Sequence, residues 1–350
     1  MEITKKAFGK TPEGQEVSLF TLRNENGMTV EITNYGGIVV SLFVPDKDNQ
    51  LVDVTLGYDN IEDYFENRRY FGALIGRHAN RIEGASFVLN GKKYEVERND
   101  GNNHLHGGNT GLHKVLWNAQ IQQVDGGESL VLTYHSPDGE ENYPGNLDLK
   151  VIYSLTNDNA LKIDYYGKSD QDTVLNMTNH AYFNLAGHDS GTILDHQLQI
   201  DADFFTVIND ECIPTGEIRS VVGTPMDFRE LTTIKPGLET DDEQIRCGQG
   251  YDHNWVLRKQ ERLSKAATLY HPASGKVMEV FTTKPGIQFY SGNFVEDDEG
   301  KNGAVYQKWA GLCLETQFFP NSLKHTHFPS PILKAGEEYH HTTIFKFSNK

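Results

Sequence analysis

The chain has 350 residues, of which 37% are hydrophobic, so it is long enough to bury a sizeable core and has the composition of a folded protein. Its formal net charge is −17, from 32 basic and 49 acidic side chains. A field of this sign repels phosphate backbones and anionic lipids, which argues against nucleic acid and membrane surfaces as partners.

The cysteines and the start of the chain bear on the compartment. Three widely spaced cysteines, Cys212, Cys247 and Cys313, argue against a disulfide framework or a cysteine-based zinc site. The first residues, MEITKKAFGK, have no apolar stretch after their lysines and do not resemble a secretory signal. No apolar run approaches the roughly 20 residues needed to span a bilayer. We therefore expect a soluble, cytoplasmic protein.

Strand patterns occur along the whole chain. The strand-rich stretches are, in chain order, residues 28–46 with a break at Gly36-Gly37, residues 86–97, residues 130–169 with breaks at Asp138-Gly139 and at 157–159, residues 267–283 and residues 338–348. Residues 86–97 are predicted to form a hairpin, because Asn90-Gly91 suits a turn that needs positive φ at both central positions.

Helical signal is thin, and residues 59–69 are its best case. Asp59 and Glu62 have the spacing of a capping box at the start of a helix. The predicted apolar face of this helix consists of Ile61, Tyr64 and Phe65.

No linker rich in proline, glycine or serine divides the chain, and no repeat of fixed period occurs. We therefore predict an all-β protein, a single large antiparallel β-sandwich domain over residues 1–350, in preference to a tandem of immunoglobulin-like domains.

Two kinds of motif lack residues that a phosphate or metal site would need. GGNTGLHK, from Gly107, lacks the glycine before the lysine and the following Ser or Thr of a phosphate loop. Three histidine pairs lack a carboxylate or a third histidine at recognisable spacing; they are His104 and His106, His325 and His327, and His340 and His341. We therefore predict no metal and no cofactor.

Two ionisable residues lie in runs of strand-forming or apolar residues. His180 lies in TNHAYFNLAG, where an imidazole is either a satisfied core residue or a proton-transfer group. Glu315 lies in GLCLETQFF, and a glutamate buried there needs a functional reason.

Further polar groups lie in glycine-bounded, β-rich stretches: Asn80 and Arg81 in IGRHANRIEGASF, His106 in NNHLHGG, Asp252 in GYDHNWVL and Gln288 in KPGIQFYSGNF. Each has a plainer interpretation: Arg81 as a surface cation, Asp252 as a turn residue, Gln288 on a solvated strand face. Together with TNHAYFNLAG and LETQFFPN, these motifs resemble those of the aldose 1-epimerase (galactose mutarotase) family. The resemblance covers nearly the whole chain, and the motifs occur in the family's order.

The resemblance implies a galactose mutarotase-like β-sandwich with a sugar cleft across one face. It implies interconversion of the α and β anomers of aldohexoses such as galactose and glucose, on a small-molecule aldose, by a monomer or homodimer. By the matching motifs, His180 would be the general acid and Glu315 the general base. The residues that would hold the sugar are Asn80, Arg81, His106, Asp252 and Gln288, with Tyr182 near it.

The chemistry is consistent with these residue types. Mutarotation removes a proton from the anomeric hydroxyl and delivers one to the ring oxygen, and a carboxylate with an imidazolium can do both. Three alternatives remain: an epimerase of phosphorylated hexoses, a non-catalytic carbohydrate-binding or sugar-sensing protein, and a glycosidase that uses Glu315 with Asp252 as its carboxylate pair.

Overall fold

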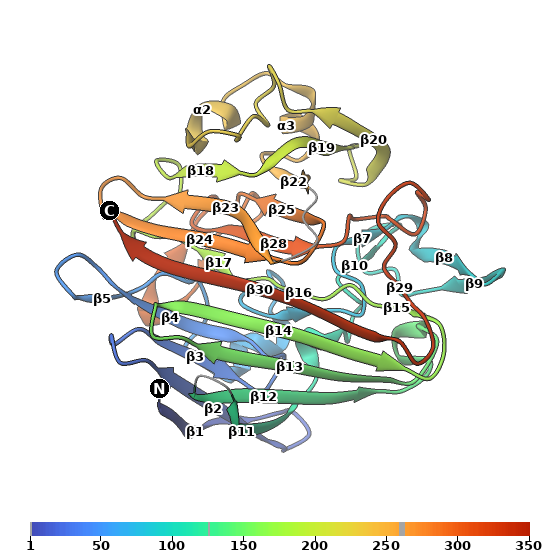
Figure 1. The fold of residues 1–350 in the computed structure, drawn as a ribbon, viewed down its shortest axis with the longest axis horizontal. Helices are drawn as coiled ribbons and strands as arrows, with labels where there is room; N and C mark the ends of the chain where they lie inside the picture. The colour runs from blue at the N-terminus through green and yellow to red at the C-terminus, as the bar shows by residue number, and fades with distance from the viewer. Residues whose placement is uncertain (1, 125–126, 259–262) are drawn as a thin grey trace.

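The predicted strands form three large antiparallel sheets in the computed structural model, which describes residues 2–124, 127–258 and 263–350. The largest sheet has nine strands, in the spatial order β11 (Asn118–Val124), β12 (Gly127–Ser136), β13 (Leu147–Leu155), β14 (Ala160–Ser169), β30 (Glu338–Asn349), β24 (Lys276–Thr282), β23 (Ser264–Tyr270), β18 (Gln197–Ile200) and β21 (Thr232–Thr233). Figure 1 shows the C-terminal strand β30 between β14 and β24, so that strands from distant parts of the chain share one sheet.

Two smaller sheets complete the architecture. The N-terminal sheet has five strands, β1 (Glu2–Lys10), β2 (Glu16–Arg23), β3 (Thr29–Thr33), β4 (Val39–Pro45) and β5 (Leu51–Asp53). The other has six strands, in the order β17 (Tyr182–Phe183), β28 (Leu312–Gln317), β25 (Gly286–Tyr290), β22 (Asp252–Leu257), β19 (Ala202–Ile208) and β20 (Pro214–Ser220).

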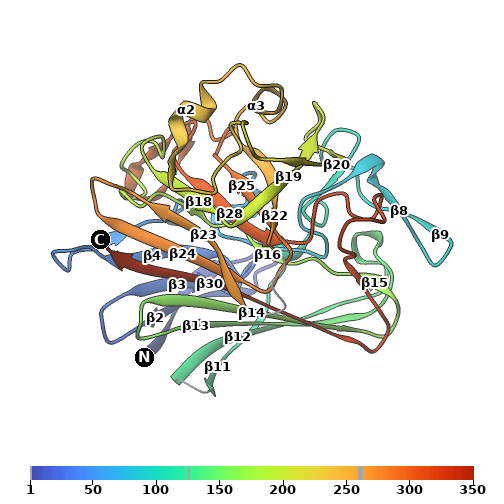
Figure 2. The ribbon, with the colours of Figure 1, turned by 45° about the horizontal axis from the view of Figure 1, so that its top comes forward.

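Short strand pairs and helices fill the connections. The pairs are β6 (Leu74–Ile75) with β16 (Thr178–Asn179), β7 (Arg81–Ile82) with β10 (His104–Leu105), β8 (Ser86–Leu89) with β9 (Lys92–Glu95), β15 (Thr173–Val174) with β29 (Ile332–Leu333), and β26 (Asp298–Glu299) with β27 (Val305–Tyr306). The α-helices are α1 (Ile61–Glu66), α2 (Ile234–Leu238) and α3 (Glu243–Cys247), and 3₁₀ turns cover Glu83–Ala85, Leu112–Lys114, Glu140–Asn142 and Lys301–Gly303. Helices α2 and α3 lie at the end of the molecule beyond β18–β20 (Figure 2). In the part of the chain that the structure describes, no helix is long and apolar enough to cross a membrane.

The main core lies between the nine-stranded sheet and the two smaller sheets, which makes the molecule a sandwich. Its members include Leu132, Val151, Ile163, Val280 and Phe345 of the large sheet, Leu22, Val30 and Leu42 of the N-terminal sheet, and Trp255, Phe289 and Leu314 of the six-stranded sheet. Alternate residues of a strand point to opposite faces, so Leu312 and Leu314 of β28 enter this core while Cys313 and Glu315 face away from it. That outer face of the six-stranded sheet carries the site.

The predicted β-fold and its hairpins are confirmed. Strands β8 and β9 form the hairpin at Asn90-Gly91, whose φ angles are 51° and 78°. Residues 130–169 contain most of β12 and all of β13 and β14, in antiparallel register, and residues 338–348 lie within β30.

The predicted capping box is wrong. Helix α1 covers only Ile61–Glu66, and its N-cap is Asn60, without a side-chain hydrogen bond to the helix. Asp59 instead accepts the backbone N–H of Asn302 at 2.6 Å. The carboxylate of Asp59 therefore forms a tertiary hydrogen bond instead of the local bond to the helix that its spacing predicted.

Candidate active site

Strand register brings the site residues together on the outer face of the six-stranded sheet. Glu315 of β28 is directly opposite Gln288 of β25. One row along, Tyr182, Cys313, Tyr290 and Asp252 follow one another across β17, β28, β25 and β22. Residues directly opposite each other in an antiparallel pair point to the same face, so four distant stretches of sequence form one surface.

Above this surface lies a cavity of about 310 Å³, which is within the size range of small-molecule sites. It is lined by Arg68, Arg69, Tyr70, Asn80, Arg81, Asp100, Leu105, His106, His180, Tyr182, Asp252, Tyr290, Phe294 and Glu315. All the residues expected at the site from the sequence line it except Gln288, which lies behind Asp252 and donates a hydrogen bond to Asp252 Oδ1 at 2.7 Å.

Several lining residues were missed by the sequence analysis, namely Arg68, Arg69, Tyr70, Asp100, Leu105, Tyr290 and Phe294. Tyr70 lies five residues before the quoted stretch that begins at Ile75, and both Tyr290 and Phe294 lie within the stretch that contains Gln288. Nothing in the local pattern distinguishes these residues from ordinary core aromatics, and only the fold places them at the cavity.

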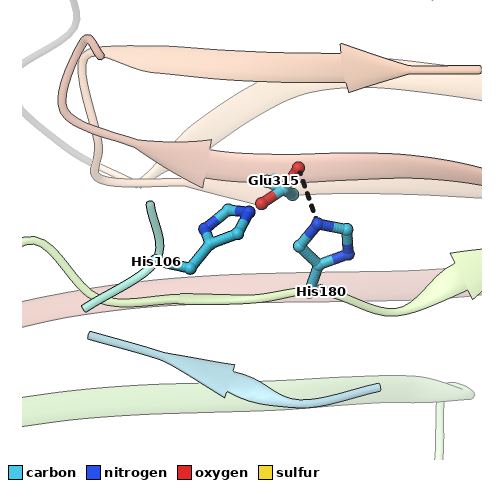
Figure 3. A group of neighbouring side chains, drawn as sticks. All are labelled: His106, His180 and Glu315. Carbon is cyan, nitrogen blue, oxygen red and sulfur yellow. Dashed lines mark ion pairs between the residues drawn. The ribbon is translucent and has the colours of Figure 1, made fainter. Parts of the chain in front are cut away.

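The central feature of the cavity is the approach of His180 to Glu315 (Figure 3). His180 Nε2 lies 3.6 Å from Glu315 Oε1, and the two side chains are 6% and 2% exposed. This separation is longer than a strong hydrogen bond. Within the described residues, Glu315 Oε2 has no hydrogen-bond partner. The carboxyl group therefore retains free acceptor capacity inside the cavity.

The backbone and neighbouring rings hold His180 in place. Its N–H donates to Ala73 O at 2.9 Å, and its carbonyl accepts the N–H of Gly72 at 3.1 Å. Its Nδ1 lies 3.5 Å from Cys313 Sγ. The ring of Tyr182 lies roughly parallel to the imidazole, with centroids 5.2 Å apart. The imidazole is thus fixed with Nε2 toward Glu315.

Burial shifts the two pKa values of this pair in opposite directions. Burial, and then the charge of Asp252, raise the pKa of Glu315 well above its usual value. Burial lowers the pKa of His180 from 6.5 to about 4. Both shifts favour the neutral forms, because both charged forms lose hydration in the cavity. The two groups nevertheless lie only 3.6 Å apart, so a bound ligand that forms hydrogen bonds with either of them can decide which one holds a proton.

His106 is held in a single tautomer. Its Nδ1 accepts the backbone N–H of Asn80 at 3.1 Å, so in the neutral ring Nε2 carries the proton. Burial, and then the charges of His180 and Arg81, lower the pKa of His106 well below its usual value. His106 is therefore a neutral hydrogen-bond donor that lines the cavity. Figure 3 shows its ring beside His180 and Glu315.

The same tautomer argues against a metal ion here. One nitrogen or oxygen from each of His106, His180 and Glu315 lie within 4.8 Å of one another, and two histidines with a glutamate are a known zinc ligand set. A metal at His106 Nε2 would require the proton on Nδ1, where it would oppose the Asn80 N–H. The donor set is therefore a poor fit to a metal.

A second group of possible ligands, Asp195, His196 and His271, lies outside the cavity. His196 Nε2 accepts the N–H of Leu185 at 3.0 Å, and both histidines contact the Asp195 carboxylate at 3.2 Å. These contacts account for the nitrogens that a metal would need.

On the opposite side of the cavity, Arg81 connects two carboxylates. Its Nε donates to Asp100 at 2.7 Å, and its Nη1 lies 3.6 Å from Asp252. Asp252 is further held by Gln288. Burial raises the pKa of Asp252, although Arg81 and Gln288 oppose this. Both oxygens of Asp252 thus have partners, in contrast to the free Oε2 of Glu315.

Solved structures with this architecture identify the fold. An aldose epimerase homologue from C. elegans superposes with a TM-score of 0.88 at 29% sequence identity, covering 95% of this chain and 99% of the other. A galactose 1-epimerase from Lactobacillus acidophilus gives a TM-score of 0.87 at 28% identity, covering 100% of this chain and 99% of the other. The protein therefore has the galactose mutarotase-like fold, as predicted.

Comparison of the sequence with known families and proteins identifies the family within this fold. Residues 18–346 match the family described as aldose 1-epimerase. A galactose mutarotase from Sus scrofa is 42% identical over 350 residues, which is 99% of this chain and 99% of that protein. The chain belongs to the aldose 1-epimerase family.

Proposed function

We propose that this protein is an aldose 1-epimerase, an isomerase that interconverts the α and β anomers of aldohexoses such as galactose and glucose. Its relatives named galactose mutarotase and aldose 1-epimerase match nearly its whole length. The observation that carries the proposal is the buried contact between His180 and Glu315 at 3.6 Å, in a polar cavity of small-molecule size.

In the proposed reaction Glu315 takes the proton of the anomeric hydroxyl, and His180 gives a proton to the ring oxygen. The bond between the anomeric carbon and the ring oxygen breaks, and an open-chain aldehyde forms. Rotation about the adjacent carbon–carbon bond presents the other face of the aldehyde, and reclosure returns both protons to their original groups. Each proton transfer contributes about 10²–10⁴-fold to the rate.

The reacting form of the pair holds one proton in total. An ionised Glu315 with a protonated His180 starts the reaction, and a protonated Glu315 with a neutral His180 is the state after ring opening. The opposed pKa shifts of the free protein favour the second arrangement. Hydroxyl groups of the sugar would donate to the free Oε2 of Glu315 and favour the first.

The remaining cavity residues are proposed to hold the sugar. Arg81, Asp252 and Asn80 offer donors and acceptors to its hydroxyl groups, and His106 offers the Nε2–H that its tautomer fixes. Tyr182 forms a wall beside His180. The buried amide of Gln288 acts through Asp252, because it donates to that carboxylate and does not line the cavity.

The alternatives are distinguished by charge and by the acid–base pair. Arg68 and Arg69 line the cavity and could favour a phosphorylated hexose, but each already contacts a carboxylate, Glu66 at 3.5 Å and Asp298 at 3.1 Å respectively. The net charge of −17 also disfavours a dianion. A non-catalytic sugar-binding protein would have no need for a buried glutamate with an unpartnered oxygen beside a histidine.

Polarimetry of freshly dissolved α-galactose tests the proposal. The rotation should relax faster with the protein than without it, and His180→Asn should abolish most of the acceleration. His135→Asn is a matched control, because His135 contacts Asp148 at 2.7 Å in an exposed histidine–carboxylate pair away from the cavity. The proposal fails if the wild-type protein does not accelerate the change. A faster reaction with a hexose 6-phosphate than with the free hexose would favour the phosphorylated substrate.

A further inference from the structure

Tyr70 occupies an unusual backbone conformation at the wall of the cavity. It lies between α1 and β6 and has a φ of 58°, which residues other than glycine and asparagine rarely adopt. The turn is fixed by its neighbours. Tyr70 donates its N–H to Asn67 O at 2.9 Å and accepts the N–H of Ala73 at 3.1 Å. The side chain of Asn67 accepts the N–H of Phe71 at 2.9 Å. This backbone directs the Tyr70 side chain to the cavity.

The ring of Tyr70 contacts three histidines. Its centroid lies 4.7 Å from that of His106 and 4.9 Å from that of His113, in both cases edge to face. It lies 5.8 Å from that of His180, with only 30° between the two planes. The imidazole of His180 therefore has two phenol rings roughly parallel to it, because Tyr182 lies at 28° to the same ring.

This arrangement favours the protonated form of His180. The face of an aromatic ring carries partial negative charge and attracts a cation, more strongly where water is excluded. The attraction opposes the loss of hydration that favours the neutral imidazole. It is strongest when His180 carries the proton that ring opening requires, so the contact acts on the reacting state.

We propose that Tyr70 is a positioning residue for the acid: its ring holds the imidazole of His180 toward Glu315 and stabilises that imidazole while it is protonated. The inference rests on the proposed function, in which His180 delivers a proton to the ring oxygen of the sugar. It adds a residue that does not itself transfer a proton.

The other two histidines that contact the Tyr70 ring are neutral near neutral pH. Burial, followed by the charge of Lys114, lowers the pKa of His113 to about 3. His106 is neutral for the reasons given above. Among the three rings that Tyr70 contacts, only His180 approaches a carboxylate within 4 Å in the described chain. A change at Tyr70 is therefore expected to reach catalysis through His180.

Other titratable and charged groups around His180 could also change their protonation when Tyr70 is replaced. They are Glu315, Cys313, His106, His113, Tyr182, Tyr290, Asp252 and Arg81. Tyr70 itself stays protonated near neutral pH, because burial, and then the charge of Asp100, raise its pKa to about 12. Its hydroxyl group could contact a sugar directly, so the ring and the hydroxyl must be tested separately.

Two substitutions separate these roles. Tyr70→Phe keeps the ring and removes the hydroxyl. Tyr70→Asn removes the ring but suits a positive φ, so the turn is preserved. Tyr166→Asn is the matched control, because Tyr166 stacks on His340 at 4.2 Å and 7° on the nine-stranded sheet, away from the cavity. Each variant is measured by polarimetry and by NMR titration of the His180 ring signal, identified by its loss in His180→Asn.

We expect Tyr70→Asn to lower kcat about tenfold with a smaller change in KM, the effect of losing a desolvated cation–π contact. The midpoint of the His180 titration should move to lower pH, because the protonated ring is less stable. Tyr70→Phe should keep kcat within about twofold and leave the midpoint in place. Tyr166→Asn should change neither.

Three results would overturn the inference. The first is a folded Tyr70→Asn protein with unchanged kcat and an unchanged His180 midpoint. The second is a Tyr70→Phe protein as impaired as Tyr70→Asn, which would place the effect in the hydroxyl group. The third is a Tyr70→Asn protein changed only in KM, which would make the ring a simple sugar contact. The NMR midpoint does not depend on activity, so a failure of the proposed function would show separately, as a wild-type protein without mutarotase activity.

Discussion

Replacing Glu315 by glutamine should remove activity and at the same time stabilise the protein. Glu315→Gln keeps the shape of a side chain that is 2% exposed, so the fold and the cavity should be preserved. It removes the proposed base, and kcat should fall about 10²–10⁴-fold. That loss corresponds to an increase of roughly 3–5 kcal/mol in the activation barrier.

The stability gain follows from the raised pKa of Glu315. Burial, and then the charge of Asp252, raise this pKa, so the native protein binds the carboxyl proton more tightly than the unfolded chain does. The stability contributed by such a group is fully present below the unfolded pKa and is lost as pH rises toward the native pKa. Glutamine does not titrate. At neutral pH the variant should therefore be more stable than the wild type. The gain is about 1.4 kcal/mol for each pH unit above the pKa of the carboxyl group in the unfolded chain. It stops growing once the pH passes the native pKa of Glu315.

Two measurements check this prediction. Polarimetry gives kcat, and urea unfolding at about pH 4 and about pH 7 gives the difference in free energy of unfolding between variant and wild type. That difference should be larger at the higher pH. Glu16→Gln, at an exposed glutamate on β2, is the control and should change neither quantity. The reasoning is refuted if folded Glu315→Gln keeps a near-full rate, or if its stability relative to wild type is the same at both pH values.

Further predictions concern roles, pH and metals. His180→Asn should reduce kcat about 10²–10⁴-fold, and His106→Asn should reduce it less; the reverse order would exchange their roles. Asp252→Asn should mainly raise KM or alter the choice among aldoses, since its contact exists in ground and transition states alike, and a collapse of kcat alone would make it catalytic. The pH profile of kcat/KM should be bell-shaped, with limbs that belong to the coupled His180–Glu315 pair rather than to either residue alone. The acid limb should lie below the usual imidazole value, because burial lowers the pKa of His180, and the alkaline limb above the ordinary carboxyl range, because burial raises the pKa of Glu315. An acid limb at the usual imidazole value would contradict this. Dialysis against a chelator should leave the rate unchanged, and a loss that divalent metal restores would show a metal requirement.

Much of the fold is local in origin and was readable from the sequence. The hairpin at Asn90-Gly91 forms because both residues tolerate positive φ, whatever surrounds them. The alternation along residues 338–348 likewise predicts a strand from the local pattern alone, because successive side chains of a strand point to opposite faces. The prediction that these strands make one domain over residues 1–350 stays a prediction, as do the compartment and the choice between monomer and homodimer.

The sequence predicted those site residues that are ionisable but lie among apolar or strand-forming neighbours. Glu315 lies in an apolar run and His180 in a β-rich run, so each departs from its local pattern. That departure is evident from the sequence alone. Tyr70 gave no such signal, because a tyrosine near apolar residues is ordinary. Its position at the cavity depends on a backbone turn held by Asn67 and on three histidines from other segments.

The sequence by itself determined the strands, their hairpins and the two residues whose burial requires a reason. Only the tertiary structure decided which groups meet, because strand register places Glu315 opposite Gln288 across β28 and β25 and the backbone N–H of Asn80 selects the tautomer of His106. It also decided the directions of the pKa shifts, since desolvation is a property of the assembled cavity and of no local stretch. The capping box failed for the same reason: the carboxylate of Asp59 finds its partner at Asn302, far along the chain.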